Sequence, residues 1–171
     1  MRKGFLMKPN ASVEEKFDGW YVKPIKLLRD GLPEGDGGVL ALSAALFLCE
    51  RYYRVSTNTH DKFDPNSNKI FKSAAAKDFG LKEKDFEAFW KVYRNGTQHQ
   101  GIPIDNEYDG KKYKWQTRDD FGAIPSFHLL GKDTYEIRLN PWKFADLIIE
   151  KYKKDKSTLT KFFEHAFAVV N

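Results

Sequence analysis

The spacing of apolar side chains predicts helices over most of the chain. From about Ser12 to Arg29 and from about Val39 to Val55, apolar residues recur every three or four positions, the spacing that lines one face of a helix. The second segment is apolar nearly all round at its start, which predicts a central helix. Further helices are expected from Lys69 to Phe79, from Lys84 to Gln98, from Trp142 to Lys153, and from Ser157 to about Val170.

Several residues mark where these helices begin or bend. Ser12 followed by Glu15 has the pattern of a capping box, in which each side chain satisfies a backbone N–H of the other residue. Asn140 followed by Pro141 is typical of a helix start, because proline lacks an N–H that is unpaired there anyway. Pro24 lies inside the first segment and is expected to kink it.

Between about residues 102 and 140 the apolar period changes to two, which is typical of half-buried strands. Tyr113 and Trp115 alternate with lysines after an Asp-Gly turn, and two further alternating runs flank the turn at Gly131, as in a hairpin. The predicted fold class is therefore mainly α. We expect a bundle of five to six helices with a small antiparallel β insertion at about residues 102–140, all within a single domain spanning 1–171.

Composition is that of a globular chain. The 171 residues are 41% hydrophobic and 31% charged, enough to bury a core without disulfides or a structural metal. The net charge of +5 permits a polyanionic partner without demanding one. The single cysteine, Cys49, excludes a disulfide framework and a cysteine-based zinc site. No apolar run approaches the length of a membrane span, and no secretory signal is recognisable, so we expect a cytoplasmic protein without membrane association.

Reactive side chains are concentrated at the end of one predicted helix, where Arg94, Asn95 and His99 lie within six residues. They offer a fixed cation, a hydrogen-bonding amide and a group that can carry a proton near neutral pH. In a regular helix, residues four apart share a face, whereas residues five apart are separated by about 140°. Asn95 is therefore expected to lie beside His99, with Arg94 turned away. For Arg94 and His99 to act together, either the helix ends early or two copies of the chain build the site across a two-fold axis.

This segment resembles the motif of the HEPN superfamily, specifically that of its bacterial members, in which an arginine precedes a histidine by four to six residues near the end of a helix. The residues that carry the resemblance are Phe89-Trp90-Lys91-Val92-Tyr93-Arg94-Asn95-Gly96 and His99-Gln100-Gly101. The resemblance implies a dimeric, metal-independent endoribonuclease without a cofactor, with Arg94, Asn95 and His99 at its site. The β insertion departs from the minimal bundle of that family.

The implied chemistry is transesterification of RNA by the ribose 2′-hydroxyl. His99 would act as general acid or base, Arg94 would bind the phosphate and stabilise its developing charge, and Asn95 would orient the imidazole. Glu50 follows the most apolar stretch of the chain, so it is expected either to pair with Arg94 or Arg54 or to lie exposed at the wet edge of its helix.

Two other functional classes stay open. The chain could be a non-catalytic HEPN-like module that binds RNA or dimerises within a toxin–antitoxin or defence system, with an antitoxin or other protein as partner. It could also be an unrelated helical domain in which the motif is accidental.

Two further segments carry candidate chemistry. Lys111, Lys112, Lys114 and Trp115 combine charge for a nucleic-acid backbone with a ring for bases, although an ordinary half-buried strand shows the same alternation. Asp64-Pro65-Asn66-Ser67-Asn68 has the alternating oxygens of a calcium loop. Lys69 and Ala75 stand where such a loop needs glycine and glutamate, so a turn-rich loop is favoured and no metal site is expected.

Overall fold

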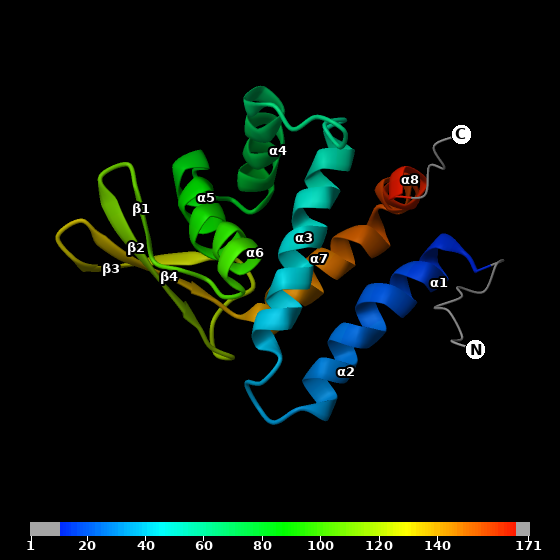
Figure 1. Cartoon of the computed structure of the whole chain (residues 1–171), viewed down its shortest axis with the longest axis horizontal. Helices are drawn as coiled ribbons and strands as arrows, with labels where there is room; N and C mark the ends of the chain where they lie inside the picture. The colour runs from blue at the N-terminus through cyan, green and yellow to red at the C-terminus, as the bar shows by residue number, and fades with distance from the viewer. Residues whose placement is uncertain (1–10, 167–171) are drawn as a thin grey trace.

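The computed structural model describes residues 11–166 and shows a mainly helical protein with one small sheet (Figure 1), which confirms the predicted fold class at that level. The elements are α1 (Val13–Phe17), η1 (Asp18–Val22), α2 (Lys23–Gly31), α3 (Gly38–Ser56), α4 (Pro65–Asp78), α5 (Glu83–Phe89), η2 (Trp90–Asn95), α6 (Gly96–Gln100), β1 (Asn106–Tyr108), β2 (Lys111–Thr117), β3 (Ser126–Gly131), β4 (Thr134–Leu139), α7 (Pro141–Lys154) and α8 (Lys156–Ala166). The segments η1 and η2 are π-helical turns, and each joins its neighbouring α-helices into one continuous helix.

The first helix begins with the predicted capping box. Ser12 Oγ accepts from the Glu15 N–H at 3.1 Å, and the Glu15 carboxylate accepts from the Ser12 N–H at 2.8 Å. The π-helical turn η1 ends at Val22, two residues before Pro24. Because proline lacks an N–H and its ring clashes with the carbonyl four residues back, a regular α-helical turn cannot precede it without distortion. The wider turn accommodates Pro24 within a continuous helix.

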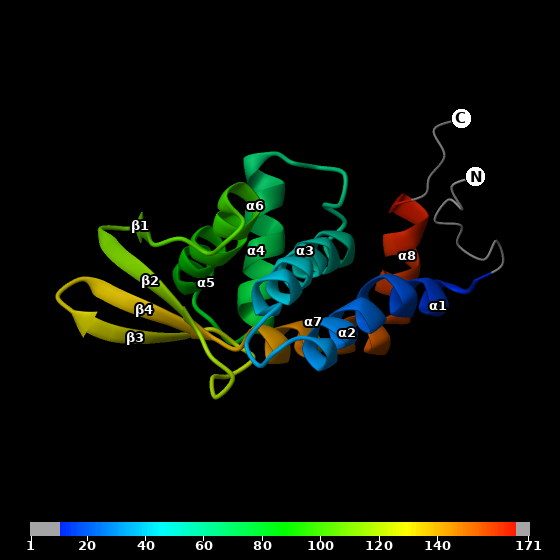
Figure 2. The ribbon, with the colours of Figure 1, turned by 60° about the horizontal axis from the view of Figure 1, so that its bottom comes forward.

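Helix α3 lies at the centre of the helical part, as its apolar sequence predicts, and it packs against α4, α7 and α8 (Figures 1 and 2). Leu42, Leu46 and Leu48 are fully buried along it. The α7 hydroxyl of Tyr152 donates to the Leu48 carbonyl at 3.0 Å, which fastens the two helices together. No helix within residues 11–166 is both long and apolar enough to cross a membrane.

The β insertion is present, but the predicted antiparallel arrangement is wrong for its central pair. Strands lie in the order β1–β2–β4–β3, and β2 runs parallel to β4, with Trp115 opposite Ile137. The two outer pairs are antiparallel hairpins. The connection 118–125 skips one strand position, and the Asn140 N–H donates to Gly122 O at 2.9 Å to hold it. Turn residues in the sequence indicate where each hairpin turns. They do not indicate that β4 lies between β2 and β3.

The sheet lies at one end of the molecule, with α1 and α8 at the other (Figure 2). Its inner face packs against the helix that carries the motif. The buried hydroxyl of Tyr93 donates to Ile137 O at 2.7 Å and lies 2.9 Å from Gln116 O, so one side chain of η2 ties together β2 and β4. Burial raises the pKa of the Tyr93 phenol, which therefore remains a donor at all ordinary pH values.

Two helix starts differ from their predicted positions. Helix α4 begins one turn early, because the Asp64 carboxylate accepts from the N–H groups of Asn66 and Ser67, both at 3.0 Å. Residues Asp64–Asn68 therefore form the start of a helix, where the sequence predicts a turn-rich loop. Helix α8 is capped by Asp155 and not by Ser157, since Asp155 accepts from the Thr158 N–H at 3.0 Å. The predicted end of that helix, near Val170, falls outside the described residues.

Gly96 marks a close contact between two backbones within the motif. A Cβ atom at this position would lie 2.7 Å from Ile104 N, 2.8 Å from Ile102 O and 2.9 Å from Pro103 Cα. The chain after α6 folds back over this point, and the Ile104 N–H donates to Val92 O at 3.1 Å. Glycine is required there because backbone atoms, unlike a flexible side chain, cannot move aside.

We expect Gly96→Ala to lower the free energy of unfolding by about 2–3 kcal/mol, since the added methyl group overpacks a backbone crossing. Urea unfolding followed by circular dichroism measures the loss. Gly19→Ala is the matched control, because a Cβ atom added there would have nothing within 4 Å. It should stabilise the helix by about 0.5–1 kcal/mol. Equal effects at the two glycines would contradict the close approach at Gly96.

Candidate functional site

Glu50 on α3 holds two arginines with one carboxylate. Its Oε1 accepts from Arg54 Nε at 2.8 Å, and its Oε2 accepts from Arg94 Nη2 at 2.7 Å and from Arg94 Nε at 2.9 Å. The Glu50 side chain is 14% exposed and that of Arg54 is 6% exposed. Since these charges are largely removed from water, each depends on the others for compensation. Glu50 thus pairs with both arginines that the sequence offered as partners.

The Arg54 side chain is almost buried, and each of its three nitrogens donates one hydrogen bond to the protein. Its Nη1 donates to Lys62 O at 2.9 Å, and its Nη2 donates to Asn68 Oδ1 at 2.5 Å. The guanidinium also lies 4.2 Å from the ring centre of Phe71 and 5.0 Å from that of Phe63. Arg54 therefore acts as a fixed support for Glu50 and for the loop that precedes α4.

Arg94, in contrast, lies where solvent can reach it. Its Nε and Nη2 donate to Glu50, and its Nη1 donates to Asn95 Oδ1 over a long 3.4 Å. A guanidinium carries five N–H groups, so one on each terminal nitrogen has no acceptor within residues 11–166. The side chain is 21% exposed. Arg94 is a positioned cation that can still bind an anion from solution.

Arg94 and Glu50 lie on the wall of an open pocket of about 370 Å³, which we call the aromatic pocket. Its rings come from η1, α3, the loop after α3, and α8, and they are Trp20, Tyr21, Phe47, Phe63 and Phe162. Its charged groups are Glu50, Arg51, Arg54 and Arg94. Three cations and one anion thus surround a mainly aromatic hollow.

Arg51 is the third guanidinium of the aromatic pocket. Its Nη1 donates to His60 O at 3.1 Å, and its Cζ lies 5.9 Å from the ring centre of Phe162. Burial lowers the pKa of Arg51, and the nearby charge of Arg54 acts in the same direction. An arginine starts so far above neutral pH that Arg51 keeps its charge.

No hydrogen bond joins Asn95 to His99 within residues 11–166, so the predicted orienting role of Asn95 is not seen within one chain. Asn95 Oδ1 accepts from Arg94, so this amide orients the arginine and not the imidazole. His99 is exposed on α6 and makes no hydrogen bond or ion pair with any residue that the structure describes.

The candidate RNA-binding residues of β2 do not form one surface. Lys112 and Lys114 are exposed on the outer face of the sheet. Lys111 and Trp115 lie on the opposite face, where Lys111 Nζ is 4.8 Å from the ring centre of Tyr135 and Trp115 packs partly buried against the core. A base stacked on Trp115 would therefore not be flanked by all three lysines.

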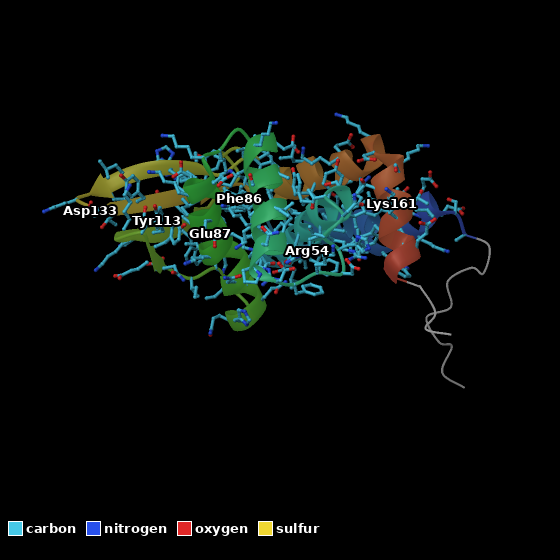
Figure 3. All side chains as sticks on the ribbon, turned by 90° about the horizontal axis from the view of Figure 1, so that it is seen from above. Arg54, Phe86, Glu87, Tyr113, Asp133 and Lys161 are labelled. Atoms are coloured by element: carbon cyan, nitrogen blue, oxygen red, sulfur yellow. The ribbon has the colours of Figure 1, made fainter. Side chains whose placement is uncertain are left out.

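The β2 lysines are also remote from the aromatic pocket. Figure 3 labels Tyr113 on β2 and Arg54 on the pocket wall, and the two lie well apart along the molecule. Within the described ranges, no group of three or more His, Cys, Asp or Glu side chains is placed to hold a metal ion. The pocket and the neighbouring motif are therefore the strongest candidate site.

Sequence reasoning missed much of the pocket wall. Phe47, Arg51 and Phe63 were not singled out, because the wall is assembled from segments distant in the chain. Phe63 gave the one usable signal. It is a large aromatic residue within the polar run 56–68 of the sequence, and in the structure this residue is 72% exposed.

No protein-family model, no curated protein and no solved structure matches this chain. The resemblance to HEPN proteins therefore rests on the motif residues and their surroundings.

Replacing Glu50 with glutamine should lower the free energy of unfolding by about 2–4 kcal/mol, because an amide cannot compensate two largely buried guanidiniums. Urea unfolding measures this change. Glu87→Gln is the control, since Glu87 accepts from Lys72 Nζ at 2.9 Å in a single, more exposed pair. Its loss should be only about 0.2–1 kcal/mol. Losses of the same size would mean that the shared carboxylate has no special structural role.

Proposed function

We propose that this protein is a metal-independent endoribonuclease of the HEPN type, in which Arg94 binds the scissile phosphate and His99 transfers protons. The proposal rests mainly on how the Arg94 guanidinium is held and on the donors it has left. Glu50 fixes its guanidinium at the edge of an open pocket and leaves donors unused. Five residues later, His99 is exposed and has no described side chain competing for its ring nitrogens.

The reaction needs no nucleophile from the protein. The ribose 2′-hydroxyl loses its proton to a base as its oxygen attacks the neighbouring phosphorus, and the bond from phosphorus to the 5′-oxygen breaks. The departing oxygen takes up a proton, which leaves a 2′,3′-cyclic phosphate and a free 5′-hydroxyl. His99 serves as the base or the acid, and the unused N–H groups of Arg94 stabilise the charge that builds on the phosphate oxygens.

The site is proposed to combine two copies of the chain. Within one chain Arg94 lines the pocket and pairs with Glu50, and no hydrogen bond joins Arg94 to His99 among the described residues. In a homodimer with two-fold symmetry, Arg94 of each copy would meet His99 of the other. Two equivalent composite sites would result.

The first test is cleavage of single-stranded RNA in the presence of a chelator. We expect the wild-type protein to release products ending in cyclic phosphate and to leave single-stranded DNA intact, because DNA lacks the 2′-hydroxyl. His99→Ala should reduce the rate by about 10²–10⁴-fold, as expected for loss of acid–base catalysis. Arg94→Ala should reduce it by about 10²–10³-fold.

His128→Ala is the matched control, because His128 is also an exposed histidine but lies on β3, outside the motif. It should cleave at the wild-type rate. Equal cleavage by wild type, His99→Ala and Arg94→Ala would assign the activity to a contaminant or to another site. No cleavage by the wild-type protein would reject the catalytic proposal.

The second test asks whether two chains build one site. Arg94→Ala and His99→Ala proteins are each expected to be nearly inactive, and mixing them should restore cleavage. A mixed dimer has one site that takes Arg94 from one chain and His99 from the other, and both residues are intact there. Half of a random mixture is mixed dimers, so activity should recover to roughly a quarter of wild type. No recovery, with subunit exchange verified, would place the whole site within one chain.

One observation favours a second candidate, a non-catalytic HEPN-like module that binds RNA or dimerises, with a toxin–antitoxin or defence partner. Asn95 bonds to Arg94, so no described side chain orients the His99 imidazole. RNA binding that is lost in Arg94→Ala, without cleavage by the wild-type protein, would support this candidate.

A further inference from the structure

The aromatic pocket has the composition of a site for a flat, polarisable group. Its volume of about 370 Å³ lies within the range of roughly 300–1,000 Å³ that is usual for small-molecule sites. Such sites are lined mainly by apolar and aromatic side chains, with a few polar groups that fix orientation. Five aromatic rings and four charged groups meet this description.

Two of the rings are conspicuously exposed for apolar residues. Phe63 is 72% exposed and Phe47 is 47% exposed, and they come from separate segments on the wall of the same hollow. A folded protein gains nothing from leaving such rings in water, whereas a stacked ligand would cover them. Unstacked bases of single-stranded RNA stack on aromatic rings and on arginine planes.

The charged residues of the aromatic pocket favour one kind of flat ligand over others. Arg51, Arg54 and Arg94 outnumber Glu50, which favours a ligand that carries negative charge. Arg54 is only 6% exposed and lies against the ring of Phe71, whereas Arg94 is 21% exposed and has two N–H groups available at the edge of the pocket. Gln98, exposed on α6, adds a neutral amide to the same wall. An anion at Arg94 and a ring inside the pocket would therefore be neighbouring parts of one ligand.

We propose that the aromatic pocket binds one unstacked nucleobase of single-stranded RNA, stacked between Phe47 and Phe63, while the adjoining phosphate lies on Arg94. This inference deepens the proposed ribonuclease function and rests on it for the identity of the polymer. The pocket would then set the position of the cut, because the base that enters it fixes which phosphate reaches Arg94.

The test measures binding and does not depend on cleavage. Fluorescently labelled 2′-O-methyl oligonucleotides, whose nucleophile is blocked, are titrated with protein and followed by anisotropy. Removing one base at a time should reveal a position where an abasic site weakens binding about tenfold, since base–aromatic stacking contributes about 1–3 kcal/mol. In Phe63→Ala or Phe47→Ala, binding of the intact oligonucleotide should weaken similarly, and the abasic penalty should disappear.

Leu40→Ala is the matched control, because Leu40 is an exposed apolar residue of the same helix as Phe47, is 62% exposed and is not part of the pocket. It should leave both affinities unchanged. A free nucleoside monophosphate in competition distinguishes the two sources of a base. The proposal expects it to displace the oligonucleotide only at concentrations far above those at which the oligonucleotide binds, and tight binding of the mononucleotide would overturn the assignment to RNA.

The outcomes separate this inference from the proposed function. An abasic penalty that persists in the Phe47 and Phe63 variants, or no penalty at any position, would overturn the base pocket while leaving cleavage by Arg94 and His99 possible. A penalty abolished by those variants, in a protein that does not cut RNA, would retain the base pocket and reject catalysis. Unaltered RNA binding in both variants would overturn the base pocket as well, and is the result expected if the pocket instead receives a side chain of a protein partner.

Discussion

The site depends on one carboxylate shared between two helices. Glu50 and Arg54 lie one turn apart on α3, and Arg94 reaches the same carboxylate from η2. Two guanidiniums this close would repel each other if the carboxylate were absent, so Glu50 determines how near η2 can lie to α3. The same contact decides which N–H groups of Arg94 remain available. Arg94 is thus both a partner in a structural ion pair and a candidate binding group.

The local sequence predicts local structure well here. The capping box at Ser12, the central apolar helix and the turns of both hairpins follow from patterns a few residues long. The parallel pairing of β2 with β4 does not, because it depends on a strand inserted from later in the chain. The π-helical turn η2 does not follow from the local sequence either, and the side-chain hydrogen bond of Asn95 is to Arg94, although the sequence predicts His99 as its partner.

The same difference between local and long-range information applies to the candidate site. Arg94, His99 and Glu50 could be singled out because each stands in a recognisable local context. The pocket beside Arg94 and Glu50 could not be predicted, since its wall joins η1, α3, the following loop, η2, α6 and α8. Tyr93 adds a constraint from outside the pocket. Tyr93 directly precedes Arg94, and its hydroxyl bonds to two carbonyls of the sheet. The β insertion therefore helps to hold the motif in place.

The pairing of α3 with α7 has a consequence for how the protein is made. Tyr152 bonds to a carbonyl 104 residues earlier in the chain, and the whole β insertion lies between the two helices. Contacts of such long sequence separation form late, because a large loop must close before they contribute. During synthesis, the face of α3 that packs against α7 and α8 therefore stays uncovered until those helices leave the ribosome. The nascent chain is most exposed to aggregation and to chaperones during that interval, and the two arginines that share Glu50 have both been synthesised before the core beneath them is complete.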